Sequence, residues 1–288
     1  MKKILLCILV FVAAGYFVVM ETETGQDLFL DRLLSVMTQN QQTAPVDGLD
    51  VYICGASSPL STTGNAQSCV FIIAGDRSFV VDTGPGSPRV IRRLGLPLNN
   101  LEAVLLTHFH GDHISALGDV NFNSWVAGRG KKLTVMGPEG VDLVVNGFNQ
   151  AYSLDSSYRT RHHGWDILPL EYSVMQSKTI EAGLVFEEDG LSIRAFRVDH
   201  SPIEPAVGYR FDYKGRSVAV SGDSIVTEDY REAVDGVDLL LADALSEVLV
   251  SKMSEALSAN GNERTSKLIH DVLDYHASTT SLVEMAKQ

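Results

Sequence analysis

Cysteines and basic residues are scarce in this sequence of 288 residues, and each scarcity narrows the possible functions. The three cysteines do not have the spacing of a zinc knuckle. The 23 lysines and arginines are outnumbered by 36 aspartates and glutamates, which gives a net charge of −13. A negative field does not attract phosphate backbones over long range, so nucleic acid is disfavoured as a partner. The sequence also has no internal repeat and no low-complexity tract, and its 45% apolar residues are enough for the core of a globular domain.

The N-terminal segment differs from the remainder of the chain. Lys2 and Lys3 precede an uncharged apolar run over residues 4–20, which is typical of a secretory signal. Small residues at positions 13–15 favour cleavage, whereas the apolar character of residues 16–20 favours an uncleaved membrane anchor, and a buried core helix is a third reading. In the first two cases the remainder is exported, either to the periplasm or anchored in the inner membrane. Cys54 and Cys69 would then lie where a disulfide persists, although two separate buried thiols are the alternative.

Hydrophobic periodicity divides the rest of the chain into a linker with a short helix over residues 21–48 and one domain over residues 49–288. Strands are expected at 50–54, 68–74, 78–81, 103–106, 184–198, 206–213, 216–220 and 239–241, and helices at 88–94, 114–122, 140–152, 246–259, 264–273 and 280–287. Residues 153–181 show no clear period, and such a long irregular segment is typical of a lid or a pocket wall, or of a surface excursion.

Four side chains suited to metal binding follow the apolar strand at 103–106 within six residues. Residues two apart on an extended backbone project to the same side, so His108 and His110 can share one ion. Gly111 permits a turn that directs Asp112 and His113 toward a second ion. Imidazole and carboxylate suit zinc, and they also suit iron or manganese. Without a metal, the desolvation of these groups would not be compensated.

Two further metal-compatible residues follow predicted strands, His200 after residues 193–198 and Asp223 after residues 216–220. Loops at strand ends are where rigid scaffolds assemble sites. The run Val80-Val81-Asp82-Thr83-Gly84 would by itself suggest an aspartic protease, whose mechanism needs two carboxylates. Such a motif occurs once in the sequence, and the histidine cluster would stay unexplained on that view.

The order of these motifs resembles the metallo-β-lactamase superfamily. Within it, Val198-Asp199-His200, Gly208-Tyr209-Arg210-Phe211 and Tyr275-His276 resemble the branch that contains ribonuclease Z and bacterial arylsulfatases. The region 141–170 looks closer to the arylsulfatase-like members than to those that process transfer RNA. The resemblance extends from about residue 49 to the C-terminus.

The resemblance implies an α+β fold, a four-layer αββα sandwich that holds two metal ions, usually Zn²⁺. The implied ligands are His108, His110 and His200 for the first ion, Asp112 and His113 for the second, and Asp223 for both. Asp112 would also accept a proton from the attacking water or orient it, and Asp82 would fix the ligand loop. A histidine at the position of His276 acts as acid or base in ribonuclease Z members, while a polar residue at a helix N-terminus is the alternative role.

Two departures from the family pattern stand out. Family members carry another ligand histidine on a final strand, and this chain stops at Gln288 before such a strand. Either the sequence is a truncated form, or a water or a neighbouring histidine fills the ligand position, or only one ion binds tightly. Residues Ala242-Asp243-Ala244 stand where ribonuclease Z members have His-Glu-Ala, which weakens the RNA-processing interpretation.

The main functional prediction is an exported metal-dependent hydrolase that uses a metal-activated hydroxide on a small ester, namely an arylsulfate, a phosphodiester or a lactone. The segment 152–165 would line its pocket. One alternative is a ribonuclease Z-like endonuclease that processes RNA 3′ ends. Another is a non-catalytic metal-binding protein with an incomplete second site.

Overall fold

A computed structural model of the chain describes residues 2–37, 47–59 and 64–287 and divides it into two units, Met1–Thr43 and Ala44–Gln288. The first unit consists of helices α1 (Lys2–Glu21) and α2 (Glu23–Met37). Between them, the Thr22 hydroxyl accepts a hydrogen bond from the backbone N–H of Gly25 at 3.1 Å. Across the described residues, no helix has both the length and the apolarity needed to cross a membrane.

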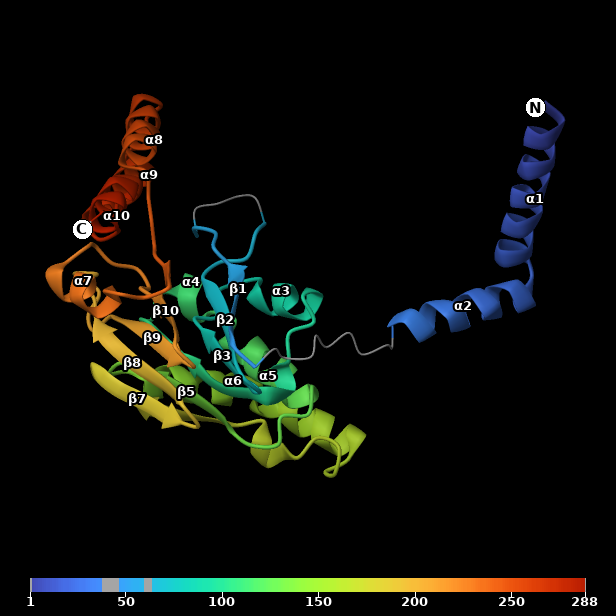
Figure 1. The fold of residues 1–288 in the computed structure, drawn as a ribbon, viewed down its shortest axis with the longest axis horizontal. Coiled ribbons are helices and arrows are strands. Elements are labelled where there is room, and N and C mark those ends of the chain that lie inside the picture. The colour runs from blue at the N-terminus through green and yellow to red at the C-terminus, as the bar shows by residue number, and fades with distance from the viewer. Residues whose placement is uncertain (1, 38–46, 60–63, 288) are drawn as a thin grey trace. The chain divides into compact units, whose positions relative to one another are not determined.

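The second unit contains two β-sheets (Figure 1). The first has the order β1-β2-β3-β4-β5-β6 and the second β11-β10-β9-β8-β7. The strands are β1 (Leu49–Gly55), β2 (Cys69–Ala74), β3 (Arg77–Val81), β4 (Leu101–Leu105), β5 (Leu133–Gly137), β6 (Met175–Thr179), β7 (Gly183–Glu188), β8 (Leu191–Arg197), β9 (Val207–Tyr213), β10 (Arg216–Val220) and β11 (Leu239–Leu241). Strands β3 to β6 run parallel, so their carboxyl ends meet at one edge of the sheet.

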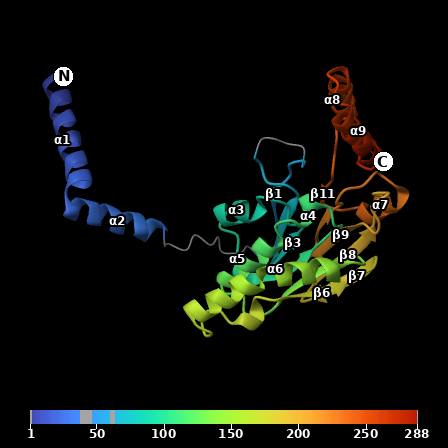
Figure 2. The same ribbon diagram turned by 180° about the vertical axis from the view of Figure 1, so that it is seen from behind.

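The second unit also contains helices between and after the strands. They are α3 (Ser87–Arg93), α4 (Gly111–Ile114), α5 (Leu117–Val126), α6 (Val141–His163), α7 (Glu228–Val234), α8 (Glu247–Ala259), α9 (Glu263–Asp271) and α10 (Thr279–Met285). Helices α3, α5 and α6 lie along the first sheet in both views (Figures 1 and 2). Helix α7 packs on the second sheet, where Tyr230 stacks on Phe196 of β8 at 6.1 Å between ring centres.

The alternation of side chains along β2 shows how the layers are built. Phe71 packs into the core between the first sheet and its helices, whereas Ile72 packs into the core between the two sheets. This period of two is what a strand buried on both faces requires. Phe79 of β3 meets Phe211 of β9 across the inner core with ring centres 5.9 Å apart. The predicted four-layer αββα sandwich is therefore confirmed.

The prediction of an irregular segment over residues 153–181 is wrong in two parts, because α6 continues to His163 and residues 175–179 form β6. The last turns of α6 bury the polar Ser156 and Thr160, which are four residues apart, so the hydrophobic period disappears although the helix continues. The Thr160 hydroxyl donates to the carbonyl of Leu168 at 2.8 Å. The helix ends at Gly164, whose φ of 99° breaks the helical path.

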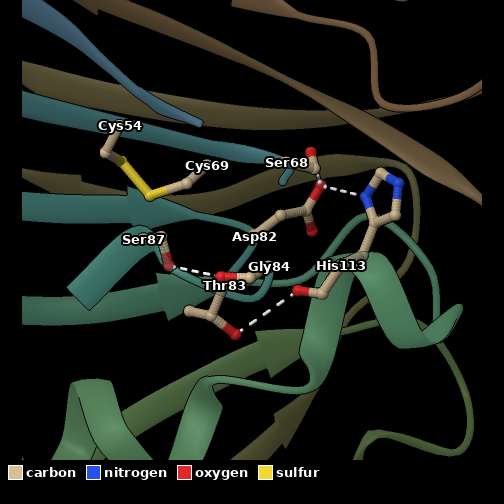
Figure 3. Close-up of a disulfide and its surroundings, with 8 residues drawn as sticks. All are labelled: Cys54, Ser68, Cys69, Asp82, Thr83, Gly84, Ser87 and His113. Carbon is tan, nitrogen blue, oxygen red and sulfur yellow. Dashed lines mark hydrogen bonds and ion pairs between the residues drawn. A yellow bond between two sulfur atoms is a disulfide. The ribbon is translucent and has the colours of Figure 1, made fainter. Parts of the chain in front are cut away.

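A disulfide joins Cys54 of β1 to Cys69 of β2 (Figure 3). The sequence left open either a disulfide or two separate buried thiols, and the structure has the disulfide. Both cysteines are 1% exposed, and their Cα atoms are 5.0 Å apart. The bond lies where the β1–β2 register shifts between Ile53 and Gly55. It therefore fixes the start of β2 next to Ser68, a residue that contacts the site described below.

Candidate metal centre

The predicted ligands lie in loops that follow three strands and in one short helix. His108 and His110 follow β4, and the backbone of His110 is extended at the start of α4, which carries Asp112 and His113. His200 follows β8, and Asp223 follows β10. Helix α4 lies at one end of the sheets in both ribbon views (Figures 1 and 2). Ligands from distant parts of the sequence thus reach one edge of the sandwich.

The structure brings all six predicted ligands together in two sets that share Asp223. The ligand atoms of His108, His110, His200 and Asp223 lie within 4.8 Å of one another, and so do those of Asp112, His113 and Asp223. The Asp223 carboxylate is 3.2 Å from His113 Nε2 and 4.0 Å from His108 Nε2. Each set offers enough ligand atoms to hold a metal ion, and Asp223 belongs to both sets.

His108 provides an independent test of whether a metal fits. Its ring is fully buried, and its Nε2 atom has no hydrogen-bond partner among the described residues. Burial, assisted by the charge of His113, lowers the pKa of His108 to about 2, so the ring is neutral and keeps a lone pair. An unpartnered buried nitrogen is costly unless something binds it. The donor set of imidazoles and carboxylates fits zinc, iron or manganese.

Asp82 is not itself one of the predicted ligands, but it orients His113 of the second ligand set by hydrogen bonds. Its carboxylate accepts hydrogen bonds from His113 Nδ1 at 2.8 Å, from the Thr107 N–H at 2.9 Å and from the Thr107 hydroxyl at 2.8 Å. Ser68 lies 3.5 Å from the same carboxylate (Figure 3). Because Asp82 holds Nδ1 of His113, Nε2 is the nitrogen that is directed toward Asp223 and left for a metal. The run of residues 80–84, which by itself would suggest an aspartic protease, therefore serves in this fold to orient His113.

The charges around His113 and Asp223 reinforce each other. Burial by itself would lower the pKa of His113, but the carboxylates of Asp82 and Asp223 outweigh it and raise that pKa well above 6.5. Burial would raise the pKa of Asp223, and the hydrogen bond and charge of His113 instead hold it below the usual range. Asp223 is therefore ionised at neutral pH, the state in which a carboxylate binds a cation.

His200 is held by the C-terminal part of the chain. Its Nδ1 donates to the backbone carbonyl of Tyr275 at 2.9 Å, which leaves Nε2 toward His110 Nδ1 at 3.4 Å. Burial lowers the pKa of His200, which favours the neutral ring. The same C-terminal segment is fixed by two backbone hydrogen bonds, from Leu245 to Ala277 and from Thr279 back to Leu245, each 2.9 Å long.

Asp243 is a site residue that the sequence analysis missed. Its carboxylate accepts a hydrogen bond from His276 Nδ1 at 2.5 Å, and His276 Nδ1 is 3.8 Å from Asp223. The burial of His276 would lower its pKa, but Asp243 outweighs burial and raises it. Residues 242–244 had been treated as a departure from the family pattern. The signal that could have found the pair was an acidic residue at the centre of that triplet.

Glycine is required where the loop after β3 crosses the ligand loop. A Cβ atom on Gly84 would lie 2.2 Å from the backbone carbonyl of Asp112. The same loop is tied to its neighbours by hydrogen bonds from the Thr83 N–H to the His113 carbonyl at 2.6 Å and from the Gly84 N–H to the Ser68 carbonyl at 2.8 Å. The close approach positions Asp112 through its backbone.

The segment 152–165, most of which is the end of α6, contacts α5 and not the ligands in the contacts described for it. Tyr152 donates to Asp119 at 2.6 Å, and Arg159 lies over the Phe122 ring at 4.5 Å. The prediction that this segment lines the pocket gains no support from these contacts.

The sequence of this chain is similar to one protein-family model and to known proteins. A model of the β-lactamase superfamily domain matches residues 77–272. A ribonuclease Z from Mycobacterium bovis is 30% identical over 243 residues, which cover 83% of this chain and 82% of that protein. A ribonuclease Z from Mycolicibacterium gilvum is 32% identical over 241 residues, covering 83% and 79%.

Two solved structures share the fold at lower sequence identity. The short form of human tRNase Z superposes with a TM-score of 0.54 at 17% identity, over 80% of this chain and 93% of that one. A diphosphatase of the PhnP family superposes with a TM-score of 0.53 at 16% identity, over 83% and 82%. At these identities the likeness concerns the fold alone.

Proposed function

The chain belongs to the β-lactamase superfamily, and from this premise we propose that it is a metal-dependent hydrolase that cleaves phosphodiester bonds in RNA. The ribonuclease Z relatives support this reading, which was the alternative in the sequence analysis. They support it better than the main prediction of a small-ester hydrolase.

The Asp243–His276 pair is the observation that carries the proposal. Phosphodiester cleavage needs a proton for the departing oxygen, and a histidine beside the metal ligands can supply it. Asp243 occupies Nδ1 of His276, so Nε2 is the atom that can reach a substrate. Because Asp243 also raises the pKa of His276, the ring keeps a proton to donate near neutral pH.

The remaining residues bind the ions and orient water. His108, His110 and His200 would hold one ion, Asp112 and His113 a second, and Asp223 would contact both. Bound zinc supplies Lewis acidity that lowers the pKa of a bound water to about 7. Asp112, beside His113 at 3.6 Å, is placed to accept the proton that this water releases.

The direct test compares three substrates on purified, zinc-loaded protein: a labelled RNA hairpin with a 3′ extension, bis(4-nitrophenyl) phosphate and 4-nitrophenyl sulfate. We expect cleavage of the RNA and slower hydrolysis of the phosphodiester. Hydrolysis of the sulfate alone would refute the proposal, and so would failure of all three with metal bound.

A second experiment tests the role of the pair. Asp243→Asn removes the charge that raises the pKa of His276, so the alkaline limb of the kcat profile should move to lower pH. His270→Ala, which changes a histidine exposed on α9, is the matched control and should leave the profile in place. An unshifted profile in Asp243→Asn contradicts the proposed proton donor.

The exported small-ester hydrolase remains a second candidate because of the disulfide. Cys54–Cys69 is a bond that persists in oxidising compartments and is rare in the cytosol. The net charge of −13 also agrees with a small substrate rather than a polyanion. Cell fractionation with alkylation of thiols before lysis tests export, since a periplasmic or membrane fraction with both cysteines protected supports it and a cytosolic fraction opposes it.

The number of metal ions bound per chain distinguishes the non-catalytic alternative from the two hydrolase hypotheses. One tightly held ion per chain with no hydrolysis of any of the three substrates would favour a metal-binding protein with an incomplete second site. Two ions with turnover would exclude it.

A further inference from the structure

Helix α3 presents three arginines on one exposed face. Its buried residues are Ser87, Pro88 and Ile91, which leaves the arginines at positions 89, 92 and 93 exposed. Residues three and four apart are neighbours on a helix, so these side chains lie on the same side. The helix contains no acidic residue. Like charges this close repel one another, and a bound anion would offset this repulsion.

Some exposed cations of this chain are paired with carboxylates, whereas among the described residues the arginines of α3 are not. Arg159 pairs with Asp155 at 2.9 Å, and Lys267 pairs with Asp271 at 2.5 Å. Within the described ranges, none of the three α3 arginines forms an ion pair. Arg89 instead donates to the backbone carbonyl of Gly64 at 3.3 Å. On a chain with a net charge of −13, this is an unneutralised local concentration of positive charge.

Helix α3 directly follows the loop that contacts the metal-ligand loop. Helix α3 begins at Ser87, five residues after Asp82, and a helix of seven residues is only about 10 Å long. The intervening loop touches the ligand loop, since a Cβ on Gly84 would meet the carbonyl of Asp112. Both ribbon views show α3 and α4 at the same end of the first sheet, on either side of β1 and β2 (Figures 1 and 2).

We propose that Arg89, Arg92 and Arg93 form a docking surface for the phosphate backbone of a single-stranded part of the RNA substrate, beyond the bond that is cleaved. This inference rests on the proposed function. Guanidinium groups bind phosphate oxygens in pairs of hydrogen bonds and stack on bases, which suits a flexible strand. The surface also explains how a strongly acidic protein can hold a polyanion, because attraction is confined to one helix beside the site.

A competing explanation is local to the helix. Arg92 and Arg93 lie in the last turn of α3, where the helix dipole favours cations. That explanation predicts an effect on stability and none on RNA binding, so the two can be separated.

The test measures the salt dependence of binding to a fluorescein-labelled RNA of 12 uridines in a His276→Ala background, by fluorescence anisotropy. Replacing all three α3 arginines by glutamine should reduce the slope of log Kd against log salt concentration by about 2, since each phosphate contact on a single strand contributes about 0.7. At low salt the Kd should rise by about tenfold or more. Replacing them by lysine should retain most of the slope.

The control variant removes the same charge elsewhere. Arg161, Arg194 and Arg264 are exposed on three other elements, and their replacement by glutamine gives the same net charge as the α3 variant. It should leave the slope unchanged. Equal slopes for the α3 and control variants would overturn the docking surface even if RNA is cleaved. Should the α3 variant not fold, the single changes Arg92→Gln and Arg93→Gln should each reduce the slope by about 0.7.

A parallel measurement separates this inference from the proposed function. With His276 restored, the α3 variant should hydrolyse bis(4-nitrophenyl) phosphate at the native rate, because that substrate has no strand to dock. If the native chain hydrolyses neither this ester nor RNA, the proposed function fails. If it hydrolyses the ester but does not bind RNA, the RNA substrate and the docking surface are both wrong.

Discussion

Replacing Asp82 by asparagine should disable the second metal site while leaving the first intact. Asp82 is 1% exposed and is held at a φ of 57°, a conformation that asparagine tolerates, so the change alters hydrogen bonding rather than the backbone. An asparagine side chain has one acceptor and one donor group in place of two acceptors. It cannot accept from both the Thr107 N–H and His113 Nδ1 as Asp82 does.

The expected damage follows from the tautomer of His113. If the amide group faces Nδ1, that nitrogen must accept, and the proton moves to Nε2, the atom that points to Asp223 at 3.2 Å. Loss of such an outer contact lowers metal affinity by about 10- to 100-fold. Breaking a buried charged hydrogen-bond network by changing one partner costs about 3 kcal/mol of unfolding free energy. For a domain of this size, that lowers Tm by about 6–12 °C.

Chelator competition with zinc measures the two affinities, and thermal unfolding with the chelator present measures stability. We expect weaker binding of the second ion, unchanged affinity for the first ion and a lower Tm. Ser68→Ala is the matched control, because it removes only the 3.5 Å contact to the same carboxylate. If Asp82→Asn binds two ions as tightly as the native chain, the orienting role assigned to Asp82 is wrong.

Three further changes test separate parts of the structure. His276→Ala should lower kcat by about 10²- to 10⁴-fold with two ions still bound, and an unaffected kcat at full metal content would refute its role. Replacing Cys54 and Cys69 by serine opens a link across 15 residues and should cost about 3 kcal/mol in urea unfolding, whereas an unchanged midpoint would show that the bond is not needed. Gly84→Ala, whose Cβ would lie 2.2 Å from a backbone carbonyl of the ligand loop, should weaken the second ion in chelator competition. Gly147→Ala on α6 has no neighbour within 4 Å and should leave the ion in place.

The sequence was sufficient to predict the architecture and the residues that meet at the site, because both depend on short-range patterns. The spacing of His108 and His110 on extended backbone places them on one side, and strand ends carry His200 and Asp223 to the same edge. The continuous apolar run of β2 likewise indicates a strand that is buried on both faces. Such patterns stay visible in a single sequence.

Two features could not be predicted because they depend on contacts between segments. Asp243 meets His276 only because the chain after β11 and the start of α10 are joined by the bridge between Leu245 and Ser278. The length of α6 was underestimated because polar Ser156 occupies a buried position of its inner face. In both cases tertiary structure, and not local periodicity, decides the outcome.

The residues that orient the two ligand sets come from distant parts of the sequence, so different changes should impair each set. Asp82, on the loop after β3, orients His113 of the second set. The backbone of Tyr275 orients His200 of the first set, and the next residue is His276, the proposed proton donor. A displacement of the C-terminal segment must therefore weaken both the binding of the first ion and the proton transfer, since the adjacent residues Tyr275 and His276 serve these two roles. A change at the β3 loop should instead remove the second ion and leave the Asp243–His276 pair intact, because no hydrogen bond described for that loop reaches it.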